Sequence, residues 1–188
     1  MKDSTENIES ILKGCRKGKK KAQEALFRLY ADRMFGVCRY YTRDISEAED
    51  VLHDGFLKVF DKIGKFRGDG SLEGWIRRVI VNTALERFRK HRSMFSVSEI
   101  NEDMTDQQGM SVESHISSEE LLEIIMELTP QYRLVFNLYA VEGYSHQEIS
   151  KRLGISEGTS KSNLARARTI LQKKVLQRYG TELKQQRS

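Results

Sequence analysis

Apolar residues recur every three or four positions along the first 92 residues of the chain, which is the spacing of helices with one buried face. Four such stripes lie in residues 8–15, 22–41, 45–63 and 72–84. No segment shows the sustained alternation of apolar and polar residues that indicates a half-buried strand. The pattern therefore predicts an all-α bundle that closes at residue 92.

The third stripe also predicts an acidic surface. Its apolar positions are Ile45, Ala48, Leu52, Phe56, Val59 and Ile63, and the acids Glu47, Asp50, Asp54 and Asp61 fall on the opposite side. Asp44 or Ser46 can cap the start of this helix. A loop at 65–71 precedes the next helix, which ends in a cationic run at 87–92. We expect the apolar side of the third helix in the core and its acidic side in solvent.

Helical spacing returns after a segment that has none. Residues 93–117 are rich in Ser, Asn, Gln, Met and acids without a sustained period, which is typical of a linker. Apolar residues at helical spacing resume at Ser118, break at Thr129-Pro130 and continue to the C-terminal part. We therefore expect an all-α chain of two helical domains, a bundle at 1–92 and a four-helix module at 118–188.

The C-terminal module contains the spacing of a helix-turn-helix. Ser145 and Glu148 can form a capping box at the start of one helix, and Gly154 can supply the left-handed residue that ends it. Ser156 can then cap a second helix. That helix carries the cations Lys161, Arg166, Lys173 and Lys174 between apolar residues. Two helices joined by a tight turn, the second of them cationic, favour insertion into the major groove of DNA.

The distribution of charge supports contact with a polyanion. The chain has a net charge of +5, but residues 93–131 contain no Lys or Arg and hold nine acids. The flanking parts, 1–92 and 132–188, therefore carry about +7 each. Two basic modules joined by an acidic segment indicate two separate contacts with nucleic acid, which would repel the segment between them.

The remaining composition narrows the class of protein. Cys15 and Cys38 lie among apolar residues at helical spacing, so we expect buried free thiols. The N-terminus lacks the apolar core of a signal peptide, and no run of apolar residues is long enough for a membrane span, so we expect a cytoplasmic protein without membrane insertion. No nucleophile with a partnered base and no phosphate-binding glycine loop is present, which argues against an enzyme.

Four segments, in this order, resemble an extracytoplasmic-function (ECF) sigma factor of bacterial RNA polymerase, in the sigma-70 family. They are residues 44–60, the Phe66-Arg-Gly-Asp loop, residues 75–84 and the helix-turn-helix at 143–168. A helix-turn-helix alone occurs in many unrelated regulators, but the four segments with an acidic spacer are specific. The resemblance covers nearly the whole chain.

For the first domain the resemblance implies sigma domain 2, which binds the polymerase clamp and melts the minus-ten promoter element. Asp50, His53 and Asp54 match the clamp-binding positions. Phe66 and Asn82 match positions that receive a base flipped from the non-template strand. The cations expected to hold the backbone of the opening DNA are Arg77, Arg78, Arg87, Arg89 and Lys90.

For the second domain the resemblance implies sigma domain 4, which reads the minus-thirty-five element and rests on the polymerase flap. The side chains expected at bases or phosphates are Ser160, Lys161, Asn163, Arg166 and Arg168. The acidic linker resembles the segment that threads the cationic template and RNA channel. His53 replaces the usual glutamine, Gly55 weakens its helix, and Ser160 and Asn163 replace the commoner valine and arginine or histidine.

The implied partners are core RNA polymerase, promoter DNA and a cognate anti-sigma factor, with no cofactor and a monomer when free. A metal site is conceivable because His53 follows Glu49 by four residues and Asp50 by three, but a bundle site needs such a motif on two helices and it occurs once. We expect no metal.

Simpler interpretations remain open for the site residues. Without the resemblance, Phe66 would more readily plug its loop into the core, and Asn82 could be an exposed polar residue. The cations at 87–92 could be a solvated helix end favoured by the helix dipole. At the level of the whole chain, the alternatives are a stand-alone helix-turn-helix regulator with a sensing or dimerising bundle, and an interaction adaptor that binds only protein.

Overall fold

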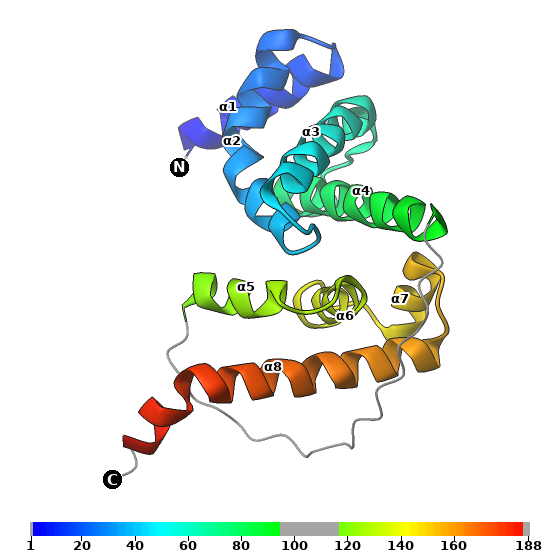
Figure 1. Ribbon diagram of the computed structural model, residues 1–188. Helices are drawn as coiled ribbons and strands as arrows, with labels where there is room; N and C mark the ends of the chain where they lie inside the picture. The colour runs from blue at the N-terminus through cyan, green and yellow to red at the C-terminus, as the bar shows by residue number, and fades with distance from the viewer. Residues whose placement is uncertain (1, 95–116, 186–188) are drawn as a thin grey trace. The chain divides into compact units, whose positions relative to one another are not determined.

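The computed structural model describes residues 2–94 and 117–185, and throughout these residues the regular structure is helical (Figure 1). The predicted all-α class is confirmed. The chain divides into two compact units, residues 1–91 and 92–188, each with its own apolar core. The predicted linker at 93–117 lies almost entirely outside the described residues.

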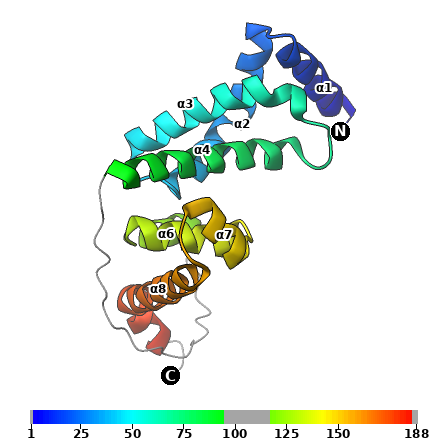
Figure 2. The ribbon, with the colours of Figure 1, turned by 90° about the vertical axis from the view of Figure 1, so that its right-hand side faces the viewer.

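The N-terminal unit is built from four α-helices and one short 3-10 turn. They are α1 (Lys2–Arg16), α2 (Lys20–Arg39), α3 (Ile45–Lys62), η1 (Ile63–Lys65) and α4 (Leu72–Met94). Gly18, at φ 67°, supplies the left-handed residue of the turn between α1 and α2. Helices α3 and α4 run side by side, as both ribbon views show (Figures 1 and 2), and the ion pair between Lys58 and Glu86 joins them.

The core of this unit follows the predicted stripes with two exceptions. Its largest fully buried side chains are Leu26, Met34, Phe56, Ile63, Ile76, Ile80 and Leu85. Ile45 and Leu29 belong to the same stripes but are 63% and 49% exposed. Ile45 is the first residue of α3, at the end of the helix, and its exposure shows that its assignment to the core was wrong.

Both cysteines are buried free thiols, as predicted. Burial raises the pKa of the Cys15 thiol and raises that of Cys38 to about 12. The reactive species of cysteine is the thiolate, so neither thiol is a nucleophile at neutral pH. Both side chains contribute to packing.

Gly55 marks a close approach of α3 to α4. It is buried, and a Cβ built on it would overlap the Cδ1 atom of Ile80. Ile80 is itself fully buried, so a shift of its methyl group would have to displace other atoms of the core. The glycine that weakens α3 as an isolated helix is therefore required by the packing of two helices.

The C-terminal unit consists of α5 (Ser118–Met126), α6 (Pro130–Phe136), the π-helical segment η2 (Asn137–Val141), α7 (His146–Leu153) and α8 (Glu157–Gln185). Its core is formed by α5, α6, α7 and one face of α8. The buried apolar side chains include Ile124, Ile125, Leu134, Leu138, Ile149, Leu164, Ala167 and Leu171. These four α-helices form the predicted helical module.

The predicted helix signals of the helix-turn-helix are present. The Ser145 backbone N–H donates to Glu148 Oε2 at 2.9 Å, and the Glu148 N–H donates to Ser145 Oγ at 3.3 Å, which completes the capping box. The backbone N–H and the hydroxyl of Ser145 both donate to the Glu148 carboxylate, which lowers the pKa of Glu148. Gly154 is left-handed at φ 67°. The Thr159 N–H donates to Ser156 Oγ at 3.0 Å, which caps α8.

An ion-pair cluster joins α5 to α8. Glu127 binds Lys174 and Arg178, and Arg178 also lies 3.4 Å from Glu123. The hydrogen bond from Lys174 lowers the pKa of Glu127. Lys174, which the sequence places among the DNA-facing cations of this helix, is thus engaged within the protein because α5 packs on that side of α8.

None of the helices in the described part of the chain combines the length and apolarity that crossing a membrane requires.

We predict that Gly55→Ala lowers the free energy of unfolding, although alanine favours helices. The added methyl group would impose strain of about 1–3 kcal/mol against Ile80, which exceeds the gain in helix propensity of roughly 0.5–1 kcal/mol. Gly36→Ala is the matched control, because Gly36 lies inside α2 with open space at its Cβ, and it should stabilise. Denaturant unfolding measures both, and stabilisation by both variants would show that the helices do not approach closely at Gly55.

Candidate nucleic-acid and protein interfaces

The outward face of α3 carries three of the predicted site residues. Asp50, His53 and Asp54 fall at helical spacing on this face, and Leu57 continues it with 67% of its surface exposed. His53 Nδ1 lies 2.9 Å from the Glu49 carbonyl oxygen, and the imidazole stacks on Phe27 with 6.2 Å between ring centroids. The face thus combines two carboxylates, an oriented imidazole and an exposed apolar side chain.

Leu57 was not among the predicted site residues. The signal that could have identified it is its spacing, because it lies three residues after Asp54 and seven after Asp50 on the same helix. An exposed leucine is unremarkable alone. Beside two acids on a predicted binding face, it adds exposed apolar surface to that face.

Arg87 connects this acidic face to α4. Its Nη1 atom lies 3.2 Å from Asp50 Oδ2, and its Nε atom lies 3.2 Å from Asp54 Oδ2. The three side chains come from two groups that the sequence assigned to different partners, polymerase and DNA. We define this arrangement as the Arg87 bridge. In this structure the guanidinium of Arg87 binds the two acids.

Phe66 lies in the loop between η1 and α4 and is half-buried. Its ring packs against Trp75 with 5.7 Å between centroids, and its backbone N–H donates to the Ile63 carbonyl at 3.2 Å. Arg16 Nη2 donates to the Phe66 carbonyl at 3.0 Å. At the far end of the loop, the Gly74 N–H donates to Ser71 Oγ at 3.0 Å. The loop is anchored at both ends, and Phe66 remains partly exposed.

The polar face of α4 carries the other predicted DNA ligands. Arg78 is exposed and Asn82 is half-buried four residues later, so the two lie on the same side of the helix. Arg77 is half-buried on the adjacent side, and Arg89 and Lys90 are exposed near the described end of the helix. The structure therefore brings Arg78 and Asn82 together on one element and holds Arg87 in the bridge.

The predicted DNA-facing residues of α8 divide into two groups. Lys161 and Arg168 are exposed and Arg166 is half-buried, whereas Ser160 and Asn163 are 0% and 4% exposed. Ser160 and Asn163 share a helical face with the buried core residues of α8, which turns both side chains into the module. The structure therefore buries these two side chains, and their assignment to DNA contacts stays a prediction.

Ser160 has a partner inside the module. Its Oγ atom lies 2.9 Å from Nδ1 of His146, the first residue of α7. The His146 ring stacks on Tyr139 at 4.8 Å, and the Arg168 guanidinium lies 5.6 Å from the Tyr139 centroid. These contacts connect the two helices of the helix-turn-helix with η2. The replacement of a commoner valine by Ser160 is thus matched by a polar neighbour.

The comparisons with known proteins agree with this arrangement. The model of sigma-70 region 2 matches residues 26–94, and that of sigma-70 region 4 matches residues 118–171. These two regions define the class of protein as a sigma-70 family sigma factor. Within this family the chain belongs to the ECF RNA polymerase sigma factors.

Three relatives illustrate the similarity. The ECF sigma factor SigM of Mycobacterium tuberculosis is 29% identical over 154 residues, which cover 82% of this chain and 77% of SigM. The RNA polymerase sigma-H factor of Pseudomonas aeruginosa is 26% identical over 180 residues, covering 89% of this chain and 93% of the relative. SigW of Bacillus subtilis is 24% identical over 183 residues, covering 89% and 96%.

Two solved structures are also similar. The sigma factor RpoE in complex with the anti-sigma factor NepR from Bartonella quintana has 19% identity and a TM-score of 0.48, covering 80% of this chain and 94% of that chain. CnrH in complex with the cytosolic domain of CnrY has 19% identity and a TM-score of 0.46, covering 90% and 97%.

We predict that Ser160 and His146 are energetically coupled. Ser160→Ala removes the hydroxyl that bonds His146 and should lower the free energy of unfolding by about 0.5–1.5 kcal/mol. The same loss should be absent in a His146→Ala background, as a double-mutant cycle would measure. Ser162→Ala is the control, because Ser162 is exposed on the same helix. Additive effects of the two substitutions would rule the coupling out.

Proposed function

We propose that this sigma factor binds core RNA polymerase through the α3 face and binds promoter DNA through the Phe66 loop, α4 and α8. In this proposal residues 1–92 are sigma domain 2, residues 93–117 the acidic linker and residues 118–188 sigma domain 4. The observation that carries it is the placement of an acidic face and a base-accessible loop on adjacent elements of one packed unit. The shared core holds the two surfaces in a constant geometry.

The α3 face suits a partner that offers cations around an apolar patch. Asp50 and Asp54 supply the charge, and Leu57 supplies apolar surface to bury. An arginine of the polymerase can replace Arg87 at the two carboxylates. The replacement costs little, because exposed ion pairs contribute about 0–1 kcal/mol each. Polymerase binding would then release Arg87 for the phosphates of promoter DNA, so that the two events support one another.

Promoter opening is assigned to the Phe66 loop and α4. Extruding one base from a duplex costs a few kcal/mol, and stacking on an aromatic ring returns about 1–3 kcal/mol per base. The accessible part of the Phe66 ring can provide such a stack, and the amide of Asn82 can read a base edge. The exposed cations Arg78, Arg89 and Lys90 would hold the phosphates of the separated strand.

Recognition of the minus-thirty-five element is assigned to the exposed side of α8. Lys161 and Arg168 are available for bases or phosphates, and Arg166 is accessible in part. Buried Ser160 acts through His146 by fixing α8 against α7. Promoter preference at this element therefore depends on three outward cations and on the internal contacts that aim them.

Several further assignments complete the proposal. The chain performs no chemistry itself, since the polymerase makes the phosphodiester bonds, and it needs no cofactor or metal. It acts in the cytoplasm as a monomer when free. The family resemblance implies a cognate anti-sigma factor, which would inhibit by covering a polymerase- or DNA-binding surface.

The function is tested by transcription with purified core polymerase and this chain on a library of genomic DNA fragments. We expect transcripts whose start sites follow a common promoter sequence, and none with core polymerase alone. Failure to bind core polymerase would contradict the proposal. Tight sequence-specific DNA binding by the free chain, without such transcripts, would instead support a stand-alone regulator.

A further inference from the structure

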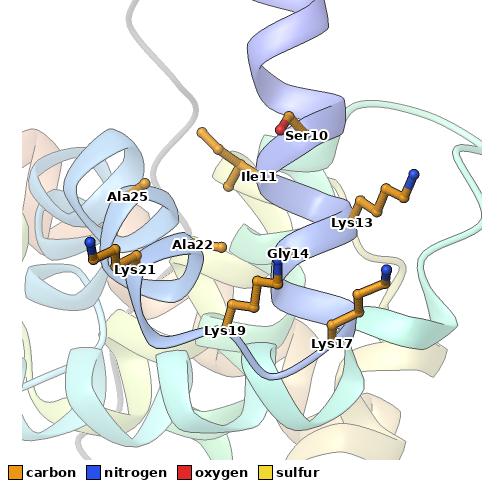
Figure 3. Close-up of a pocket in the computed structure, with 9 residues that line it drawn as sticks. All are labelled: Ser10, Ile11, Lys13, Gly14, Lys17, Lys19, Lys21, Ala22 and Ala25. Carbon is orange, nitrogen blue, oxygen red and sulfur yellow. The ribbon is translucent and has the colours of Figure 1, made fainter.

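A concentration of cations lies at the turn between α1 and α2, far in sequence from the proposed DNA ligands. Six of the nine residues from 13 to 21 are basic: Lys13, Arg16, Lys17, Lys19, Lys20 and Lys21. We call this segment the basic hairpin. A pocket of about 370 Å3 lies between its two helices, and Lys13, Lys17, Lys19 and Lys21 line it (Figure 3).

The lysines of the basic hairpin carry unneutralised charge. Within the described residues, none of the five forms an ion pair. Other cations of the same unit are paired, including Arg33 with Glu73 and Arg87 with two acids. The first acid of α2, Glu24 in its second turn, binds Arg28 at 2.6 Å. The hairpin therefore presents more free positive charge than folding requires.

Helix dipoles do not explain this charge. Lys13 and Arg16 occupy the last turn of α1, where cations are favourable. Lys19, however, is the N-cap of α2 and makes no capping hydrogen bond, and Lys20 and Lys21 begin that helix without an acid in its first turn. Cations at a helix N-terminus interact unfavourably with the helix dipole, so these three lysines destabilise the start of α2. Such an arrangement points to a ligand.

The basic hairpin is joined to the loop that carries Phe66. Helix α1 packs against η1, and Arg16 donates a hydrogen bond to the Phe66 carbonyl at 3.0 Å. The loop adds two exposed cations, Lys65 and Arg67. If a DNA strand places one base at Phe66, the phosphates next to that base therefore lie close enough to be attracted by the positive charges of the hairpin.

We infer that the basic hairpin binds the phosphates of the single DNA strand that flank the base captured by the Phe66 loop. This inference rests on the proposed function, because it takes its ligand from promoter opening. Lysines on flexible stems suit contacts that are independent of sequence. A lipid surface fits less well, because the exposed large hydrophobic residues of the unit, Leu29, Ile45 and Leu57, lie outside the hairpin.

The test compares two charge-matched variants by the salt dependence of holoenzyme binding to a promoter with a pre-opened bubble. The binding constant K falls as salt rises, so the slope of log K against log salt is negative. Lys13→Gln with Lys17→Gln should reduce the magnitude of this slope by about 1.4, because single strands give about 0.7 per phosphate neutralised. Arg28→Gln with Arg43→Gln removes the same charge from exposed positions outside the hairpin and outside the proposed DNA-binding elements, and should leave the slope unchanged.

Two results would overturn the inference. One is an equal slope for the wild-type protein and the hairpin variant. The other is loss of affinity for core polymerase in the absence of DNA, which would make the hairpin a polymerase contact. Failure of the proposed function is distinguishable, since wild-type holoenzyme would then not bind the promoter. In that case the same slope comparison with the free chain and a single-stranded oligonucleotide decides whether the hairpin takes phosphates.

Discussion

The packing of α3 against α4 at Gly55 and Ile80 determines the geometry on which the N-terminal unit depends. Because Gly55 of α3 has no Cβ, α4 can approach α3 until the side chain of Ile80 fills the space beside the glycine. That contact sets which residues of α4 lie opposite the acids of α3, and it brings Arg87 to 3.2 Å from both carboxylates. It also holds Asn82 in a constant position relative to the loop at the start of α4. The packing of the core in this unit therefore also determines where its surface side chains lie.

The Arg87 bridge is a weak interaction. In the proposed function, the acids exchange Arg87 for a cation of the polymerase, and Arg87 exchanges the acids for DNA phosphates. Asp50, Asp54 and Arg87 are partly exposed, with side-chain exposures of 63%, 47% and 30%. Solvent screening limits each of these ion pairs to about 0–1 kcal/mol. A bridge of this strength keeps the acids and the arginine in register while either partner remains exchangeable. In the C-terminal unit, by contrast, His146 fixes α8 through the buried hydroxyl of Ser160, which a competing ligand does not reach.

The features that could be predicted from the sequence are local ones. The capping box at Ser145, the left-handed Gly154 and the buried cysteines depend on residues close in the chain or on a simple apolar period, and all are confirmed. What could not be predicted depends on which neighbour packs where. A helical period places Ser160 beside the core stripe but cannot decide whether a small polar residue there faces in or out. It likewise cannot reveal that Arg87 of α4 pairs with Asp50 of α3, or that Lys174 is held by Glu127. The roles of the individual site residues remain predictions.

The separation of polymerase binding from promoter opening within one unit can be decided by one paired comparison. It measures core affinity without DNA, and promoter opening at saturating holoenzyme, for Asp50→Asn with Asp54→Asn and for Asn82→Ala. The geometry predicts that the α3 variant loses core affinity but opens promoters once bound, whereas Asn82→Ala keeps core affinity and opens less DNA. Loss of the same step in both variants would contradict the assignment of α3 to the polymerase and of α4 to the opened strand.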